Sequence, residues 1–346
     1  MLATIIHGAK DLRLEERPEP EAPGDDQVLL RFGAGGICGS DLSYFNKGRV
    51  GDFTVREPLC LGHEFAGEVV DVGRKVLGLK AGDRVAVNPN HPCRMCRACV
   101  AGKGNLCYKM QFFGSAAIFP HVQGVFRESL VVGAQQCHRV SRLLDFRTAA
   151  MAEPLAVALH AVQRAGSLVG KEVLITGGGP IGCLVMLAAR YAGARRIVVT
   201  EVSEKAIKRL EVLPIDEIVN SIQDSAKIES WYDNKGHFDL SFECSGNPSA
   251  LASAIRATAS GGKVVVVGMV GMPEVALPVN PFVAREVDLV GSFRFDGEFA
   301  QAVDLLTRGA IDVAPVLTHS FPLRAAQEAF MVASDRDQSL KVHLVA

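Results

Sequence analysis

Four cysteines lie close together in the chain, in the spacing C-x2-C-x2-C-x7-C. Four thiolates that close on one ion form a tetrahedral zinc site, and this donor set leaves no position for water or substrate. We therefore expect a structural zinc. An iron–sulfur cluster is one alternative, because four thiolates also hold such a cluster, and free thiols or disulfides are another. The residues are Cys93, Cys96, Cys99 and Cys107.

A second group of metal-binding residue types is spread more widely. Cys38 stands in GGICGSD, His63 and Glu64 stand in LGHEF, and Glu153 stands in MAEPL. None of these alone is diagnostic, since a lone cysteine is more often a small buried apolar residue. Together they offer sulfur, nitrogen and oxygen donors with an open position. That set fits a catalytic zinc that polarises an alcohol or carbonyl oxygen.

A glycine-rich turn, ITGGGPIG, places Gly177, Gly179 and Gly182 in the spacing G-x-G-x-x-G. The turn follows an apolar stretch and opens a helical pattern, which is the context of a dinucleotide site. The first glycine permits the tight turn, the second lets the backbone approach a pyrophosphate, and the helix N-terminus supplies free N–H groups. We expect Pro180 and Ile181, in the same turn, to contact the cofactor.

An acidic residue at the end of the next apolar stretch bears on the choice of cofactor. Glu201 occupies this position, where a carboxylate accepts hydrogen bonds from the ribose hydroxyls of NAD. The same carboxylate repels a 2′-phosphate, so we expect NAD. Lys205 lies shortly after it and could soften that preference, which keeps NADP as the alternative.

Two kinds of element must position these residues. The first part of the chain is rich in glycine, and QVLLRFGAGGIC, EFAGEVVDVG and GDRVAVNP predict short strands of a β barrel or sandwich. From about residue 148, apolar strands alternate with helical patterns, which indicates a parallel sheet covered on both faces. We predict a cofactor domain over 148–284. The catalytic domain takes 1–147 and 285–346, because the chain returns to it near its end.

The composition excludes several classes of function. The chain has 346 residues, 48% of them hydrophobic and 22% charged, and a net charge of −1. A nucleic-acid zinc module is disfavoured because no basic stripe is present, and an anionic membrane surface is disfavoured for the same reason. No signal peptide and no long apolar run are visible. We therefore expect a cytoplasmic protein whose nine cysteines serve metals or remain free thiols.

These motifs together resemble the zinc-dependent medium-chain dehydrogenase/reductase family. That family carries a G-H-E, a C-G-S/T-D, a four-cysteine loop and a later G-x-G-x-x-G, and the resemblance covers essentially the whole chain. The chain is similar to the polyol and sugar-acid branch, because Glu153 stands in AEPLAVA where alcohol dehydrogenases have a third zinc-ligating cysteine. MQFFGSAAIFPHVQGVF, FDLSFECSGNPS and GSFRFDGEF look like the L-idonate 5-dehydrogenases; sorbitol dehydrogenases match these stretches less well.

The resemblance implies an α/β protein with a GroES-like β-rich catalytic domain and a Rossmann doubly wound parallel-sheet cofactor domain. It also implies two zinc ions per chain. Cys38 and His63 would ligate the catalytic zinc, and Glu64 and Glu153 would complete or exchange within its shell, which leaves open which of them touches the metal. A homo-oligomer is implied as well, with a tetramer favoured and a dimer as the alternative.

The resemblance further implies a path for the proton. Asp41 would hydrogen-bond the far nitrogen of His63, and Ser40 would take the proton from the zinc-bound hydroxyl. The family often has a histidine three residues after this serine, where the present chain has Ser43. Either Ser43 and water carry the proton out, or the relay is slower or follows another route.

Three residues match positions that line the substrate pocket in polyol dehydrogenases: Tyr44, Phe113 and Arg294. Arg294 is our candidate for binding the carboxylate of a sugar acid, with a structural ion pair as its alternative. Tyr44 and Phe113 could instead belong to the core. The expected activity is oxidation of L-idonate or reduction of 5-keto-D-gluconate. Sorbitol-type and L-threonine 3-dehydrogenase activities are alternatives, as is a non-catalytic protein that binds a dinucleotide.

Overall fold

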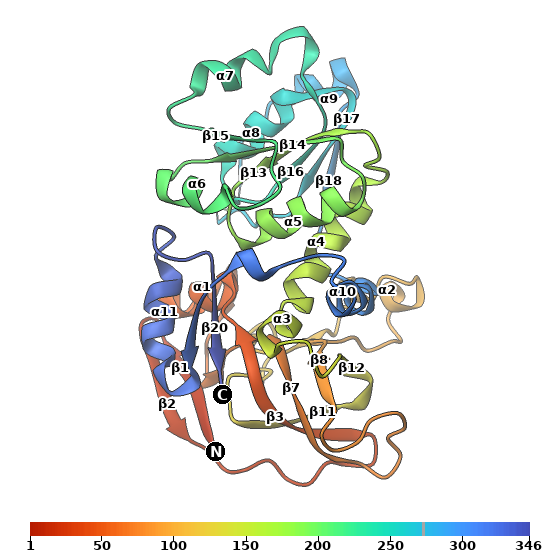
Figure 1. The fold of residues 1–346 in the computed structure, drawn as a ribbon, viewed down its shortest axis with the longest axis vertical. Coiled ribbons are helices and arrows are strands. Elements are labelled where there is room, and N and C mark those ends of the chain that lie inside the picture. Colours follow the sequence, from red (N-terminus) through yellow and green to blue (C-terminus); the bar gives the residue numbers. More distant parts are fainter. Residues whose placement is uncertain (272–273) are drawn as a thin grey trace. The chain divides into compact units, whose positions relative to one another are not determined.

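The computed structural model describes residues 1–271 and 274–346. The chain divides into two compact units, both drawn in Figure 1. The first unit contains both termini and the second contains the middle of the chain. Their residues are Met1–Glu153, Phe299–Ala310 and Leu317–Ala346 in the first, and Pro154–Glu298 and Ile311–Val316 in the second.

The first unit is made mainly of antiparallel sheets. Its strands are β1 (Leu2–Gly8), β2 (Asp11–Glu16), β3 (Gln27–Gly36), β4 (Arg49–Val50), β5 (Phe53–Thr54), β6 (Leu59–Cys60), β7 (Glu64–Val72), β8 (Arg84–Val87), β9 (Asn90–His91), β10 (Gln111–Phe112), β11 (Ser129–Gly133), β12 (Cys137–Arg139), β19 (Leu317–Pro322) and β20 (Lys341–Val345). The largest sheet has the order β12-β8-β7-β3-β20-β19, and β11 pairs with β3 as well. β2-β1-β6 form a three-stranded sheet, and β10-β9 and β4-β5 form two-stranded ones.

The helices of this unit are short, and several carry candidate site residues. They are α1 (Gly39–Lys47), α2 (Arg97–Val100), α3 (Phe146–Ala150), α10 (Glu298–Thr307) and α11 (Ala326–Ser334), with 3-10 turns η1 (Gly104–Leu106), η2 (Ala134–Gln136) and η5 (Leu323–Ala325). The helix α4 (Ala152–Ala165) begins in the first unit and continues into the second. In the described part of the chain, no helix combines the length and the apolar character needed to cross a bilayer.

Packing of β3 against β7 fixes the frame of the metal-binding residues. The first half of β3 alternates, and it buries Val28, Leu30 and Phe32, as expected for a strand with one face on the core. Phe32 stacks on Phe65 of β7 with ring centroids 5.6 Å apart. Since the candidate ligands stand at the ends of these strands, a rigid core below them holds their backbones in place.

The second unit is a parallel sheet with helices. Its strands are β13 (Glu172–Thr176), β14 (Arg196–Glu201), β15 (Glu217–Asn220), β16 (Phe238–Glu243), β17 (Thr258–Val266) and β18 (Asp288–Gly291), in the order β15-β14-β13-β16-β17-β18. Its other helices are α5 (Pro180–Tyr191), α6 (Glu204–Leu210), α7 (Ser225–Ser230), α8 (Pro248–Ala257) and α9 (Asn280–Arg285), with η3 (Asp233–Lys235) and η4 (Ala314–Val316). The strand order reverses between β13 and β16, and ligands of such sheets bind beside that switch point.

The boundaries of the two units differ from the predicted ones. We predicted a return to the first domain at residue 285, but β18 pairs in parallel with β17 and so extends the second unit. Its sequence, DLVG, is mostly exposed and lacks the apolar run that marks a buried parallel strand. At the other boundary, α3 packs on β3 and β7 of the first unit, so that unit extends to Glu153 and not only to residue 147.

Candidate active site and metal centres

The four cysteines of the loop between β9 and β10 converge on one point. One ligand atom from each lies within 4.8 Å of the others. Cys96 Sγ is 3.6 Å from Cys99 Sγ and 4.0 Å from Cys107 Sγ, close to the separations of sulfurs that each lie about 2.3 Å from one zinc ion. The N–H groups of Cys93 and Lys109 donate to the Cys107 sulfur at 3.2 and 3.3 Å. These donors favour the thiolate form that zinc requires.

Electrostatics in this loop also fit a cation. Hydrogen bonds from the backbone N–H groups of Cys99 and Tyr108 lower the pKa of Cys96 to about 6. Loss of hydration, with the sulfurs of Cys96 and Cys107 nearby, raises the pKa of Cys99 to about 12. Hydrogen bonds from the backbone N–H groups of Met95 and Cys96 also lower the pKa of Cys93, so two of the thiols ionise easily while Cys99 resists ionisation beside them. An ion with two positive charges at the centre removes that conflict, because coordinated thiols lose their protons.

The second metal-binding set forms at the ends of β3 and β7. Cys38, His63 and Glu64 each offer a ligand atom within 4.8 Å of the others. Cys38 caps the N-terminus of α1 directly after β3, and Glu64 is the first residue of β7. Three protein ligands with sulfur, nitrogen and oxygen donors leave one position of a tetrahedral zinc for water or substrate.

Glu153 lies beside this set but outside the three residues whose ligand atoms meet. It is the second residue of α4 and is 5% exposed. Burial raises the pKa of Glu153 to about 8, opposed by His63 and assisted by the charge of Glu64. Burial, with the charge of Glu64, also raises the pKa of Cys38 to about 11. Several groups that zinc binds as anions are thus packed where anions are disfavoured, which fits a site completed by a cation.

The predicted hydrogen bond between Asp41 and His63 is not formed. Asp41 Oδ1 lies 3.7 Å from His63 Nδ1, too far for a hydrogen bond, and this buried nitrogen has no hydrogen-bond partner in the described structure. The Asp41 oxygens instead accept from the N–H groups of Cys38 at 2.9 Å and Gly62 at 3.1 Å. Asp41 therefore holds the backbones that carry two candidate ligands, and its charge faces the Nδ1 side of the imidazole.

The two serines of the expected proton path differ in their surroundings. Ser40 is half-buried in the first turn of α1, two residues after Cys38. Ser43 donates its hydroxyl proton to the carbonyl of Arg49 at 2.7 Å. Because that hydroxyl is engaged with a backbone group, Ser43 is poorly placed to pass a proton onward. The hydrogen bond of Ser43 therefore does not support a proton path that leads from Ser40 through Ser43.

Sequence reasoning missed two residues that contact the metal-binding set, Phe112 and Lys341, and a buried histidine close to Lys341 in the same strand. Phe112 lies against His63, with ring centroids 5.1 Å apart. Lys341 is buried and donates to Glu64, and His343 is fully buried two residues further along β20. The pair Lys341 and His343 carried one signal in the sequence, since two polar residues alternate within the apolar closing strand KVHLVA.

The three candidate substrate residues have different environments. Tyr44 is 3% exposed within the core of the first unit, and its hydroxyl accepts from the N–H of Ala116 at 2.9 Å. Phe113 is half-buried against the same core. Arg294 belongs to the second unit, has φ of +53° and stacks its guanidinium on Phe293 at 4.9 Å. Tyr44 thus fits the alternative of a core residue, and it anchors the loop that contains Phe113.

The glycine-rich turn has the geometry of a dinucleotide site. It connects β13 to α5, with Gly179 as the N-cap and Pro180 at the first helical position. Gly177 has φ of +98°, and a Cβ there would meet Ser245. A Cβ on Gly179 would meet nothing within 4 Å, so the space above this residue is open. A helix N-terminus with open space above it is suited to a pyrophosphate.

Glu201 ends β14 beside this turn, as predicted. Its Oε2 accepts from the N–H of Gly178 at 2.9 Å, and its Oε1 accepts from Val202 N at 2.7 Å. The carboxylate is therefore held at the carboxyl end of the sheet, where the adenosine ribose binds in such folds. Lys205 lies in the first turn of α6, just beyond.

We expect Gly182→Ala to damage both the turn and cofactor binding. The new Cβ would lie 1.9 Å from the carbonyl oxygen of Gly177, so the turn must shift, at a cost of about 1–3 kcal/mol. The melting temperature should fall by a few degrees, and the Kd for NADH should rise by about tenfold, or about 1.4 kcal/mol. Thermal unfolding and a fluorescence titration with NADH measure the two effects.

Gly179→Ala is the matched control, because its Cβ enters open space. It should leave the melting temperature within about 1 °C while it weakens NADH binding, since the methyl group would occupy the pyrophosphate position. Unchanged NADH affinity in both variants would contradict the assignment of the turn.

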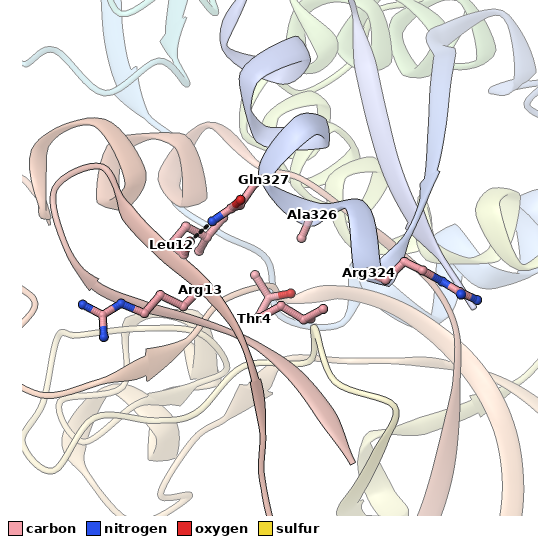
Figure 2. A pocket seen from close by; sticks show the side chains of 7 residues that line it. Thr4, Leu12, Arg13, Arg324, Ala326 and Gln327 are labelled. Atoms are coloured by element: carbon pink, nitrogen blue, oxygen red, sulfur yellow. Dashed lines mark hydrogen bonds between the residues drawn. The ribbon is translucent and has the colours of Figure 1, made fainter.

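One surface cavity of the first unit is separate from these residues. Its volume is about 330 Å³, and Figure 2 shows that the guanidinium groups of Arg13 and Arg324 extend away from each other. Gln327 donates to the carbonyl of Leu12 across it at 2.6 Å, and Arg13 is paired with Asp11. Its lining contains no predicted site residue and consists of Thr4, Leu12, Arg13, Leu14, Arg324, Ala326 and Gln327.

Comparison with known proteins gives consistent matches across the chain. Residues 24–142 match the alcohol dehydrogenase GroES-like domain, and residues 180–308 match the zinc-binding dehydrogenase domain. The chain is 42% identical to the L-idonate 5-dehydrogenase (NAD(P)(+)) of Escherichia coli (strain K12) over 319 residues, 92% of this chain and 91% of the relative. It is 38% identical to the sorbitol dehydrogenase of Gallus gallus over 348 residues, 99% of this chain and 96% of the relative.

A solved structure agrees with the same assignment. The crystal structure of L-idonate 5-dehydrogenase from Escherichia coli str. K-12 substr. MG1655 is similar with a TM-score of 0.94 and 39% identity, and the match covers 100% of this chain and 98% of that one. The predicted fold class, a GroES-like domain with a Rossmann-like parallel sheet, is confirmed. The chain therefore belongs to the zinc-dependent medium-chain dehydrogenase/reductase family, in its polyol and sugar-acid branch.

Proposed function

We propose that this dehydrogenase transfers hydride between NAD(P) and a secondary alcohol or ketone of a sugar acid, with L-idonate and 5-keto-D-gluconate as the favoured pair. The observation that carries the proposal is the convergence of Cys38, His63 and Glu64 on one point, in a chain 42% identical to an L-idonate 5-dehydrogenase. The donor set fits a zinc ion with an open position.

The proposed roles follow from the positions of the side chains. Cys38, His63 and Glu64 would hold the metal, and Glu153 lies near them without being part of the converging set. When bound, zinc lowers the pKa of an alcohol oxygen and polarises a carbonyl. Asp41 fixes the backbones of Cys38 and Gly62, so it acts as a positioning residue.

Ser40 is the proposed acceptor of the alcohol proton. It is half-buried and follows Cys38 by two residues in the first turn of α1. Phe113 and Arg294 remain the proposed substrate contacts, with the guanidinium suited to a sugar-acid carboxylate. For Tyr44 we now propose a positioning role, because its hydroxyl is bonded to Ala116.

The second metal and the cofactor complete the proposal. Cys93, Cys96, Cys99 and Cys107 would hold a structural zinc, which gives two ions per chain. In the second unit, the turn that starts at Gly177 would bind NAD, with Glu201 disfavouring the 2′-phosphate of NADP. The carboxylate lies beside the turn, bonded to Gly178, and this placement supports NAD as the better substrate.

A neutral polyol is the second candidate, because the chain is also 38% identical to a sorbitol dehydrogenase. A panel of L-idonate, sorbitol, xylitol and L-threonine, each with NAD and with NADP, separates the candidates. We expect the largest kcat/KM with L-idonate and NAD. Turnover of a neutral polyol without turnover of L-idonate would overturn the sugar-acid assignment. No turnover with any substrate, in a protein that binds NADH, would favour a dinucleotide-binding role.

We further infer a homo-oligomer, with a tetramer favoured and a dimer as the alternative. β18 stands at the end of the parallel sheet, and Leu289 on it, Phe293 after it and Val283 on α9 are exposed. An exposed strand edge with apolar neighbours is typical of a protein–protein contact. The same proposal places the chain in the cytoplasm, where thiols stay reduced for metal binding. Light scattering measures the oligomer mass.

A further inference from the structure

A lysine is buried against the metal-binding set of the first unit. Lys341, the first residue of β20, is 2% exposed. Its Nζ donates to the carbonyl of Ile37 at 3.1 Å and to Glu64 Oε1 at 2.6 Å, and it also forms an ion pair with Glu64 Oε2. Lysine is almost never fully buried unless it is paired, because removing its charge from water costs several kcal/mol. A burial of this kind therefore needs an explanation.

Three adjacent strands bring this pair together. Gly36 of β3 is paired with Glu64 of β7 on one side and with His343 of β20 on the other. Lys341 and His343 lie on the same face of β20, since side chains two residues apart in a strand point the same way. A Cβ on Gly36 would lie 1.9 Å from Glu64 Oε2 and 2.9 Å from Lys341 Cε. The absence of a side chain at Gly36 is what leaves room for the ion pair.

The contacts of this lysine place its ammonium group against the ligand set. Its Nζ has the carbonyl oxygen of Ile37 and the carboxylate of Glu64 within hydrogen-bond distance, so the group is held by acceptors from two strand ends. It faces the carboxylate of Glu64, which is also one of the three groups that converge on the proposed metal position.

We propose that Lys341 is a positioning residue for the catalytic metal, which holds the Glu64 carboxylate in place as a ligand by charge-assisted hydrogen bonds. The inference rests on the proposed metal site. Carboxylates that ligate metals are themselves hydrogen-bonded, and loss of such a partner typically costs about 10–100-fold in metal affinity or activity. A contribution to folding alone is the competing explanation, because an ion pair that joins β20 to β7 also ties the end of the chain to the sheet.

Replacement of the lysine separates the two explanations. In Lys341→Met, Glu64 loses its anchor, and one of the two zinc ions should be released to a chelator at least about tenfold faster than in the wild type. In protein reconstituted with cobalt, the visible d–d absorption of the catalytic site should also change. Lys341→Gln keeps an N–H donor without the charge. Its rate of zinc release should therefore lie between those of the wild type and Lys341→Met. If the methionine variant does not fold, the glutamine variant carries the test.

Controls make each failure distinct. Lys263→Met removes a half-buried lysine with an acidic neighbour in the second unit, and its zinc release should match that of the wild type. In the background of Glu64→Gln, adding Lys341→Met should change zinc release little, because the lysine acts through Glu64. The inference would be overturned if both Lys341 variants released zinc at the wild-type rate and showed the wild-type cobalt spectrum. This holds even if their melting temperatures were lower. A wild-type protein that binds a single zinc would instead overturn the proposed metal site.

Discussion

Replacing Cys38 by alanine should abolish turnover while leaving the protein folded. The variant loses one of the three ligands that converge with His63 and Glu64, so the zinc content should fall from two ions per chain to one. Metal-ion polarisation is worth several kcal/mol of transition-state stabilisation, and each 1.36 kcal/mol is a factor of ten in rate. We expect kcat/KM to fall by about 10⁴-fold. Metal analysis and steady-state kinetics with the preferred substrate measure both effects.

Cys137→Ala is the matched control for this variant. Cys137 is a half-buried free cysteine of the same unit, on β12, and it is not part of either metal-binding set. Its variant should keep two zinc ions and most of the activity. NADH binding should be preserved in Cys38→Ala, because the dinucleotide turn belongs to the second unit. A Cys38→Ala protein that retains two zinc ions and wild-type turnover would contradict the assignment of the catalytic metal.

Replacing Cys107 by serine should release the other zinc and unfold the loop that contains it. The Cys107 sulfur accepts N–H bonds from Cys93 and Lys109 and faces Cys96 Sγ at 4.0 Å. Structural zinc contributes about 10 kcal/mol or more to the folding of small zinc domains, so the loop should lose its order even if only part of that energy applies. Trypsin cleavage after Arg94, Arg97 or Lys103, which are exposed, should become at least about 100-fold faster.

Met95→Ala is the control within the same loop. Met95 is 77% exposed and its thioether takes no part in the four-cysteine set, so its variant should keep both ions and the wild-type rate of cleavage. The same cleavage should appear in the wild type after a strong chelator removes both metals. Unchanged resistance to trypsin in Cys107→Ser would show that the loop is ordered without zinc, and the structural role would fail.

The four-cysteine loop and the glycine-rich turn could be predicted from the sequence more fully than the metal-binding set that includes Cys38. The four cysteines lie within one loop and the glycine-rich turn lies within one strand–turn–helix connection. Short spacings of this kind impose a local geometry wherever the chain folds, because a few residues reach only a few ångströms. The convergence of the four sulfurs and the capping of α5 at Gly179 agree with those expectations.

The metal-binding set that includes Cys38 required the fold. Sequence reasoning named Cys38, His63, Glu64 and Glu153, but it left open which glutamate meets the metal. The structure includes Glu64 in the set whose ligand atoms converge, since Glu64 begins β7 opposite Gly36 of β3, whereas Glu153 lies on α4. The predicted bond between Asp41 and His63 failed for a similar reason, because the aspartate oxygens are used by backbone N–H groups.

The sequence by itself determined the family, the two-part α/β architecture, the four-cysteine loop and the dinucleotide turn. Each of these can be recognised from short motifs whose residues lie close together along the chain. Only the tertiary structure decided that β18 belongs to the parallel sheet and that Lys341 meets Glu64. Those contacts join residues far apart in sequence. Their geometry depends on how the strands pair and on the space left by Gly36. Neither of these can be predicted from the spacing of residues in a short motif.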